Sequence, residues 1–467
     1  MPSTHPLELT ELLSLVFAYL PPRSLPICAR VSKSWYQVCI PLIWHDIDLQ
    51  AILQSPQSPA LIQNHSCLIK KFKVGYMSPE YAALRFSNLD SFEMDGQGRR
   101  DPHTNQFILA HPTVTRLRLT NFYGCPPAFW DALLGFHNLR TLSMSSLEIF
   151  GTNINQFWQL CARLEQLDIL VQHYTAFDVI LPPGNLACIK HLGVMECTYA
   201  NVPLFMEFIR RCPGLTSIRW NAAKYHEQPF LSKLPALLEA KALPYLEHLD
   251  VGARGATNDD VAKVIQSMPR ITTLSLALSY HAYQMDFATL LQPHFSNLRV
   301  LEVLPDSDIK SRLAQDIMSS CPLLEKLVAP SVDALVVTEG KPWVCSRLKV
   351  LDLAFCFDPP STVSYLQPLV FAQLSKLTRL ETWCITGPSG FSVDLRIESG
   401  LDKLFTLGRL RSVVLNDIVE RMDVAEVDWM LEHWKSLMVF RGKLNTYDDA
   451  IRGALKERLG RHGIKEW

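Results

Sequence analysis

A six-residue pattern, L-x-x-L-x-L, recurs along most of this chain of 467 residues. Clear copies are LRTLSM at 139–144, LEQLDI at 164–169 and LEHLDV at 246–251, and Ile, Val, Phe or Met often replaces Leu. Fifteen copies, the weaker ones included, begin between Ile69 and Leu437, and four successive gaps from Leu89 to Ile189 are each 25 residues. Chance alternation of apolar residues does not keep its phase for so long. The chain is therefore constrained to a repeated architecture.

Each copy predicts a short strand, because its fourth and sixth residues alternate toward one side. Helices are expected between the strands, at 126–134, 153–161, 202–212, 259–268 and 312–321. An apolar face runs through 259–268, and Asn258 or Asp259 is expected to cap that helix. Parallel strands stack about 4.8 Å apart, whereas packed helices need about 8–10 Å. Strands should therefore line the inside of an arc and helices its outside.

The period and the strand–helix alternation resemble the leucine-rich-repeat family, over about Ile69 to Gly442. The resemblance implies an α/β horseshoe solenoid of about 15 repeats, spanning residues 69–446. The last stretch, Tyr447–Leu459, has an apolar face and either Asp448 or Asp449 as a cap. Because a terminal repeat exposes an apolar edge, residues 447–467 are expected to form a capping helix and tail.

The twelve cysteines fit a structural role in this repeat. No pair has C-x-x-C spacing, so the usual zinc and redox motifs are absent. Cys197 and Cys356 occupy the ninth position of a repeat, where the family often has Asn or Cys. Four others lie three residues before the first apolar residue of a repeat, namely Cys161, Cys212, Cys321 and Cys345. We expect them to be reduced and to pack as small buried hydrophobes.

The third and fifth residues of each copy are expected on the exposed face of the strands. In the copy that begins at Leu377, these residues would be Arg379 and Glu381. Solenoids bind ligands on this face, although an ordinary solvated surface explains any single residue equally well. Arg116 and Arg118 give weak support for an acidic or phosphorylated target. The candidate target-binding residues are Arg116, Arg118, Gln166, Asp168, His191, Arg219, His248 and Asp250.

Two long gaps between copies carry aromatic residues. The gap from Leu215 to Leu246 contains Trp220 and the segment 224–229, and the gap from Leu377 to Leu410 contains Trp383 and the segment 387–391. Insertions in repeat proteins often form loops at the binding edge. The aromatic residues could anchor a ligand or pack on neighbouring repeats, and packing is the preferred interpretation.

A different pattern occupies the first forty-four residues. Pro21 and Pro22 should end a first helix, and Ser24 and Ser32 should cap two further short helices. Three short helices are too few to bury a good core of their own, so they need another surface to cover them. One apolar face of the first helix is formed at i, i+3, i+4, i+7, i+8 and i+11 by Leu9, Leu12, Leu13, Val16, Phe17 and Leu20.

This stretch resembles an F-box, through the segments 9–13 (LTELL), 16–20 (VFAYL), 30–35 (RVSKSW) and 42–44 (LIW). Two residues depart from the family pattern, since Thr10 stands where proline is usual and Ile43 where leucine is usual. The resemblance implies an all-α three-helix domain at residues 1–48, followed by a linker or first-repeat entry at 49–68. It also implies docking on the Skp-type adaptor of a cullin-RING ubiquitin ligase through Leu9, Leu12, Leu13, Val16, Phe17, Leu20, Leu25, Val31, Trp35 and Trp44.

Two functions are compatible with this organisation. In the first, the chain is the substrate-recognition subunit of the ligase, and its repeats hold a target protein while other subunits supply the chemistry. In the second, it is a non-enzymatic scaffold or inhibitor whose N-terminal helices cap the solenoid. We expect no enzyme activity and no cofactor, because G-x-G-x-x-G, G-x-x-x-x-G-K-[ST], H-E-x-x-H and G-x-S-x-G are all absent.

Net charge and hydropathy indicate which classes of partner this chain could bind. The formal net charge of −1 gives no bulk electrostatic support for binding nucleic acid or a membrane surface. The sequence has no run of 18 apolar residues and no secretory signal pattern. We therefore expect a cytoplasmic or nuclear protein whose partners are other proteins.

Overall fold

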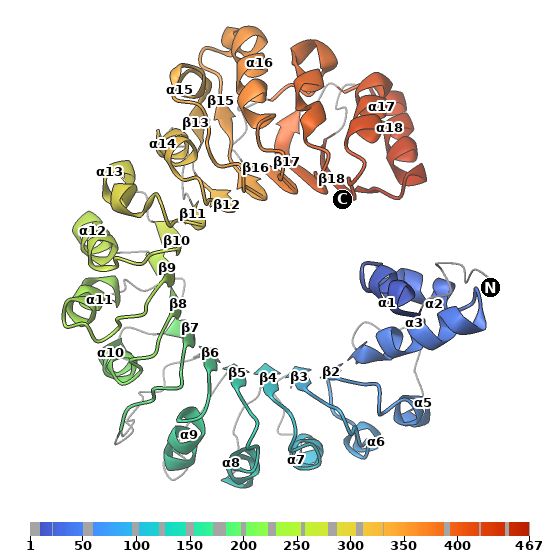
Figure 1. Ribbon diagram of the computed structural model, residues 1–467, viewed down its shortest axis with the longest axis vertical. Helices are drawn as coiled ribbons and strands as arrows, with labels where there is room; N and C mark the ends of the chain where they lie inside the picture. Colours follow the sequence, from blue (N-terminus) through green and yellow to red (C-terminus); the bar gives the residue numbers. More distant parts are fainter. Residues whose placement is uncertain are drawn as a thin grey trace, which may run out of the picture. The chain divides into compact units, whose positions relative to one another are not determined.

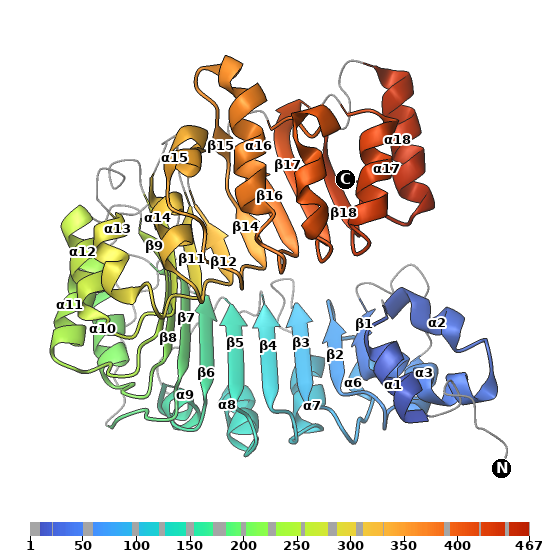
Figure 2. The same ribbon diagram turned by 45° about the horizontal axis from the view of Figure 1, so that its top comes forward.

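The computed structural model describes residues 10–20, 22–49, 59–95, 102–120, 127–145, 154–170, 184–197, 202–222, 230–253, 257–278, 287–304, 312–329, 331–386, 393–419, 422–443 and 448–466. The chain forms two compact units, Met1–Leu215 and Thr216–Trp467, called here the N-terminal and C-terminal units. In both, strands line one side and helices the other (Figures 1 and 2).

The N-terminal unit begins with three helices and continues as a parallel sheet from β1 to β7, in which each strand pairs with the next. Its helices are α1 (Thr10–Ala18), η2 (Pro22–Ser24), α2 (Leu25–Cys28), α3 (Lys33–His45), α5 (Pro59–Asn64), α6 (Pro79–Ala82), α7 (Pro102–Leu109), α8 (Pro127–Leu134), α9 (Ile154–Cys161) and α10 (Val202–Arg210). Its strands are β1 (Asp46–Asp48), β2 (Lys71–Val74), β3 (Ser91–Asp95), β4 (Arg116–Thr120), β5 (Thr141–Ser145), β6 (Gln166–Leu170) and β7 (His191–Cys197).

In the C-terminal unit, parallel strands pair in the order β8, β9, β10, β11, β12, β14, β16, β17, β18 and β19, beside a small pair formed by β13 and β15. Its strands are β8 (Ser217–Ala222), β9 (His248–Ala253), β10 (Thr273–Leu278), β11 (Val300–Leu304), β12 (Lys326–Val328), β13 (Val332–Asp333), β14 (Val350–Asp352), β15 (Phe355–Cys356), β16 (Thr382–Thr386), β17 (Ser412–Val419), β18 (Val439–Lys443) and β19 (Lys465–Glu466). Its helices are α11 (Phe230–Glu239), α12 (Asn258–Ser267), α13 (Phe287–Leu291), η6 (Gln292–His294), α14 (Leu313–Ser320), α15 (Ala334–Glu339), η7 (Pro360–Thr362), α16 (Val363–Leu374), η8 (Ile397–Ser399), η9 (Leu401–Thr406), α17 (Val424–His433) and α18 (Asp449–Arg461).

The same backbone bonds join successive repeats. The carbonyl of Asp90 accepts from the N–H groups of Thr115 and Arg116, at 2.9 and 3.0 Å. The carbonyl of Thr115 accepts in the same way from Arg140 and Thr141, at 2.8 and 3.0 Å. The fourth residue of each repeat is buried, as Phe92, Leu117, Leu142 and Leu167 illustrate. The fold is therefore the α/β leucine-rich-repeat solenoid that the sequence predicts.

One predicted register is wrong. β14 and β16 pair Val350 with Thr382 and Leu351 with Trp383, so this repeat begins at Leu380 and not at Leu377. Both leucines are buried, and the sequence LTRL offers an apolar residue at either position. The strand face here presents Thr382 and Cys384 in place of Arg379 and Glu381.

The sheet also extends beyond the predicted repeats at both ends. β1 follows α3 without a linker and pairs with β2, Asp46 aligning with Lys71, so the first strand lies before the expected entry at 49–68. At the other end, α18 is capped by the side chain of Asp448, as predicted. β19 then adds a short strand beside β18.

The helices lie within one or two residues of most predicted bounds, but two predicted caps are wrong. Thr257 caps α12 and forms a capping box with Asp260, whereas Asn258 or Asp259 was expected. The side chain of Ser24 makes no capping hydrogen bond to α2. The cap of α12 thus lies one residue before the expected position, whereas Ser24 adopts the αR conformation and not the extended backbone that a capping side chain usually has.

The four cysteines that lie three residues before a repeat are buried, as predicted. Cys161, Cys212, Cys321 and Cys345 are free thiols with no exposed surface. Burial raises the pKa of Cys212, Cys321 and Cys345 to about 12 in each case. These thiols stay protonated at neutral pH and act as small hydrophobic side chains.

Both tryptophans of the long gaps are also buried. Trp220 is fully covered and stacks on Phe230, with ring centroids 4.1 Å apart. Trp383 is fully covered and meets Phe371 edge-on. The packing interpretation is therefore confirmed for these two residues, whereas segments 224–229 and 387–391 lie outside the described residues.

His111 couples the stability of the N-terminal unit to pH. Its Nδ1 bonds the carbonyl of Phe107 at 2.7 Å, and its Nε2 accepts from the N–H of Phe86 at 3.0 Å, which requires a neutral ring. Burial lowers the pKa of His111 below its usual value. At mildly acidic pH the unfolded chain therefore binds more protons at this residue than the folded chain does. The stability that neutral His111 contributes is complete above about pH 6.5 and is lost as the pH falls through the folded-state pKa.

We expect urea unfolding midpoints of the wild type to decrease between neutral and mildly acidic pH. The His111→Gln variant should be less stable at neutral pH and should show a shallower decrease. If the urea midpoints of the two proteins changed equally with pH, neutral His111 would not be the cause of the pH dependence.

Candidate functional site

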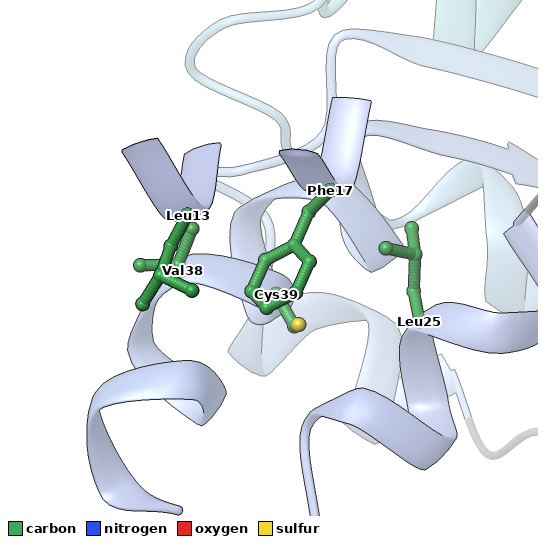
Figure 3. Close-up of a cluster of buried hydrophobic side chains, with 5 residues drawn as sticks. All are labelled: Leu13, Phe17, Leu25, Val38 and Cys39. Atoms are coloured by element: carbon green, nitrogen blue, oxygen red, sulfur yellow. The ribbon is translucent and has the colours of Figure 1, made fainter. Parts of the chain in front are cut away.

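The three N-terminal helices build a small core of their own. Leu13 and Phe17 from α1, Leu25 from α2, and Val38 and Cys39 from α3 form one buried cluster (Figure 3). Phe17 and Trp35 meet edge-on, with ring centroids 5.0 Å apart. The residues packed around this cluster all come from the same three helices and their connections: Leu20, Cys28, Ala29, Trp35, Leu42 and Ile43.

Local sequence explains why α3 lies where it does. Ser32 is extended, and its hydroxyl accepts from the N–H of Trp35 at 3.2 Å, so it caps α3 as predicted. α3 then runs through Pro41 to His45 and leads directly into β1. The helix cluster is thus attached to the first repeat without an intervening linker.

Trp44 strengthens this junction. Its side chain is buried, and its ring stacks on His65, with centroids 4.2 Å apart. His65 follows α5 in the first repeat. Within the chain, the ring of Trp44 is therefore covered by the repeat it adjoins.

Several large apolar side chains of α1 and α2 remain exposed. Leu12 and Val16 are 43% and 49% exposed, and Tyr19 is 89% exposed. An i, i+4 pair, Leu13 and Phe17, faces the core, so a second apolar stripe faces away from it. The exposed members of this surface, which we call the α1–α2 apolar surface, are Leu12, Leu15, Val16, Tyr19, Ile27 and Val31.

The predicted adaptor-binding residues therefore divide into three groups. Leu12, Val16 and Val31 are exposed, whereas Leu13, Phe17 and Leu25 form the core. Leu20 and Trp35 are partly buried against that core. Trp44 belongs to the junction, and Leu9 lies outside the described residues. Their role in adaptor binding stays a prediction.

Sequence reasoning missed Leu15, Tyr19 and Ile27 as surface residues. A signal was present, because α1 has five large apolar residues in nine, more than one helix face can hold. A helix that is apolar on two sides has two surfaces to cover. The three-helix core covers only one of them.

The exposed strand face of the N-terminal unit is electrically balanced. The third and fifth repeat positions of β1–β7 carry four cations and four carboxylates. Neighbouring strands pair these charges, with Lys71 3.4 Å from Asp46 and Lys73 3.6 Å from both Asp48 and Glu93. The cations at the beginning of this face are thus neutralised by adjacent carboxylates.

The two arginines expected to bind a target take part in this pairing. Arg116 forms an ion pair with Asp90, and Arg118 lies 3.9 Å from Glu93. Burial alone would raise the pKa of Asp90, but hydrogen bonds from Thr115 and Arg116 outweigh it and lower the pKa. An anionic target would have to compete with these carboxylates.

The other predicted target-binding residues lie on the strand faces of their own units. In the N-terminal unit, Gln166 donates to Asp168 at 2.8 Å, and His191 is exposed on β7. In the C-terminal unit, Arg219 pairs with Asp250 at 3.1 Å, and His248 is exposed on β9. Target binding by any of the eight residues stays a prediction.

Neither a metal-binding group of side chains nor a membrane-spanning helix occurs in the described part of the chain. Among those residues, no group of three or more His, Cys, Asp or Glu side chains could hold a metal ion. No helix in the same part is both long and apolar enough to cross a membrane.

Comparisons with known proteins give one family match. Residues 10–50 match the family model described as F-box-like. A comparison with curated proteins gives no match.

Two solved structures show weak likeness. TLR13 in a TLR13–ssRNA13 complex has a TM-score of 0.43 at 13% identity, with 87% of this chain and 62% of that chain covered. The chain thus spans less than two thirds of TLR13. An internalin (InlF) from Listeria monocytogenes has a TM-score of 0.31 at 12% identity, with 91% and 96% covered. Scores this low support no argument, so the repeat fold rests on the chain's own strands and helices.

The helical core and the repeats together present surfaces suited to binding other proteins. A small helical core presents an apolar surface, and it is joined through Trp44 to repeats whose exposed strand faces carry polar side chains. Such an arrangement supports a role in protein–protein interaction. The chain contains an F-box-like domain at residues 10–50 followed by a leucine-rich-repeat solenoid.

Proposed function

We propose that this protein is a substrate-recognition subunit of a cullin-RING ubiquitin ligase. The F-box-like helices would bind a Skp-type adaptor, and the repeats would bind the target protein. The observation that carries the proposal is the α1–α2 apolar surface, which stays exposed although the helices already have a core. Exposed groups of large apolar side chains are typical of sites that bind other proteins.

The proposed role needs no catalytic residue in this chain. Holding a target beside a ubiquitin-charged enzyme raises the effective concentration of the target lysines. The direct passage from α3 into β1, with Trp44 stacked on His65, would keep the adaptor and the first repeats in a fixed relation. The domain bounds 1–48, 49–68, 69–446 and 447–467 remain part of this proposal, as do a cytoplasmic or nuclear location and the eight predicted target-binding residues.

The alternative, a scaffold or inhibitor with a helical cap, has less support. A cap would cover its apolar residues with the repeats. Here Leu12, Leu15 and Val16 are exposed, whereas the junction residue Trp44 is stacked on His65 of the first repeat.

The test is binding of a purified Skp-type adaptor by calorimetry. The wild type should bind, and the Leu12→Asp/Val16→Asp variant should bind at least about a hundredfold more weakly, because complex formation would bury two unpaired carboxylates. Both side chains point away from the core, so the variant should keep its fold.

A matched control adds the same charge elsewhere on the three helices. Ser34→Asp/Gln37→Asp changes two exposed residues near the start of α3, where acidic residues are tolerated. This variant should bind as the wild type does. A wild-type protein without adaptor affinity, or equal binding by the Leu12→Asp/Val16→Asp variant, would refute the proposal and favour the scaffold.

A further inference from the structure

Three consecutive repeats of the C-terminal unit present an arginine from the same turn. The turns 345–348, 377–380 and 407–410 each close with a hydrogen bond from the fourth N–H to the first carbonyl, at 3.1, 2.9 and 3.0 Å. The third residues of these turns are Arg347, Arg379 and Arg409. The first and fourth residues of every turn are buried, which fixes the turn and leaves the arginine in solvent.

The sheet brings these arginines into a row. β14 pairs with β16 and β16 with β17, aligning Val350, Thr382 and Ser412. Each arginine lies three residues before its aligned strand residue. Because adjacent strands are about 4.8 Å apart, the three guanidinium groups start from backbone positions spaced by about that distance. We call Arg347, Arg379 and Arg409 the arginine row.

The arginine row has no internal counter-charge. Within the described residues, none of its three side chains takes part in an ion pair or a hydrogen bond. Arg411 next to it is also exposed and unpaired in that part of the chain, and Lys376 and Lys435 add two more exposed cations at neighbouring turns. Glu381, the residue before β16, is two residues from Arg379 but forms no ion pair with the arginine row among the described residues.

Two other cations of the C-terminal unit, Arg299 and Lys349, are paired with a carboxylate. Glu325 lies 3.2 Å from Arg299 and 2.7 Å from Lys349, on adjacent repeats. Hydrogen bonding from Lys349 is the main reason that the pKa of Glu325 is lowered. A repeat edge can therefore neutralise its own charges, and the arginine row does not.

Unpaired like charges on adjacent strands repel one another, and a bound anion would relieve this repulsion. Guanidinium groups form two parallel hydrogen bonds with a carboxylate, which favours arginine over lysine for this role. The chain has a formal net charge of −1, so the positive charge is a local feature rather than a general one. A narrow row fits an extended anionic segment better than a broad surface.

We propose that the arginine row binds an acidic, Asp- or Glu-rich segment of the target protein. This inference rests on the proposed role of the repeats in target binding, and it locates one contact at the turn edge of β14, β16 and β17. The strand face of the N-terminal unit, where carboxylates already pair the cations, is not the acidic-segment site.

The test uses the full chain and a fluorescein-labelled oligoglutamate peptide, followed by fluorescence anisotropy at low ionic strength. The wild type should bind this peptide and not an oligoglutamine peptide of equal length. The Arg347→Gln/Arg379→Gln/Arg409→Gln variant should bind about tenfold more weakly, since three exposed ion pairs of ordinary strength are lost.

A control variant removes the same charge from the same unit. Lys233→Gln/Lys263→Gln/Arg270→Gln changes three exposed cations, and Arg270 holds the same repeat position as the arginine row without arginine neighbours. This control should bind within twofold of the wild type. A similar loss in both variants, or none in either, would overturn the proposal.

A single-stranded oligothymidylate of equal length tests the other class of anion. Tighter binding of this DNA than of oligoglutamate, lost in the arginine-row variant, would identify a nucleic-acid site and also overturn the proposal. No adaptor is present in these measurements, so a negative result is distinguishable from a failure of adaptor binding.

Discussion

Replacing Trp220 by alanine is expected to lower the free energy of unfolding of the C-terminal unit by about 3–5 kcal/mol, the usual cost of removing a buried tryptophan. The indole is fully covered, and it stacks on Phe230 with ring centroids 4.1 Å apart. These rings join the first strand of the unit to its first helix, β8 to α11. The cavity cannot close easily, because Leu231 and Leu234 of α11 are themselves buried.

Urea denaturation followed by circular dichroism measures this loss. Trp220→Phe should recover part of the stability, because a smaller aromatic ring can still meet Phe230. Tyr245→Ala is a matched control on an exposed aromatic residue, 53% exposed, and should change the midpoint little. An unchanged midpoint for Trp220→Ala would show that the indole is not part of the core.

Replacing Gln367 by methionine is expected to lower the free energy of unfolding by about 3 kcal/mol, because three buried or partly buried backbone groups lose their hydrogen-bond partner. The Gln367 amide nitrogen donates to the carbonyls of Asp394 and Ser399, at 2.6 and 2.9 Å. Its amide oxygen accepts from the N–H of Asp394 at 2.8 Å. Methionine keeps nearly the same length and volume, so the change removes hydrogen bonds rather than packing.

The effect of losing Gln367 should be confined to the segment that its side chain binds. Residues 393–399 contain no α-helix or strand, and they depend on α16 for these bonds. Hydrogen exchange should therefore become faster in 393–399 of the Gln367→Met variant. Gln373→Met, on the same helix but only half-buried, is the control and should have a smaller effect on both stability and exchange. Unaltered exchange in 393–399 after loss of Gln367 would contradict this account.

Both substitutions concern the scaffold, whereas the proposed binding surfaces lie outside it. The α1–α2 apolar surface and the arginine row consist of exposed residues. Their variants should therefore change binding while leaving unfolding midpoints near those of the wild type. This separation lets stability and recognition be measured independently on one chain.

The repeated fold could be predicted from the sequence because its signal is redundant. The fourth and sixth positions of every copy must face the core, so the apolar period survives substitutions such as Phe92 for leucine. The same logic identified Cys161 and Cys212 as buried, because they recur at one repeat position. Because the pattern is repeated, an unusual residue in one copy does not hide which positions are buried.

Single positions lack this redundancy, so the sequence alone does not decide between two residues that fit the pattern equally well. Leu377 and Leu380 are both apolar, and only the pairing of β16 with β14 identifies the second as the start of the repeat. Trp44 belongs to the F-box pattern in the sequence, and only the structure shows that its ring stacks on His65 of the first repeat. These choices depend on contacts with residues distant in sequence.

The sequence by itself determined which elements form, because local hydrophobic period and helix length need only neighbouring residues. The tertiary structure alone decided which apolar faces remain uncovered and which charges remain unpaired. Leu12 and Leu13 are equally apolar, but only Leu13 is buried in the cluster with Val38 and Cys39. Arg116 and Arg379 are equally basic, but among the described residues only Arg116 of these two forms an ion pair, with Asp90 of the preceding repeat. Burial and ion pairing depend on neighbours in space, and for this chain those neighbours lie one repeat or one helix away.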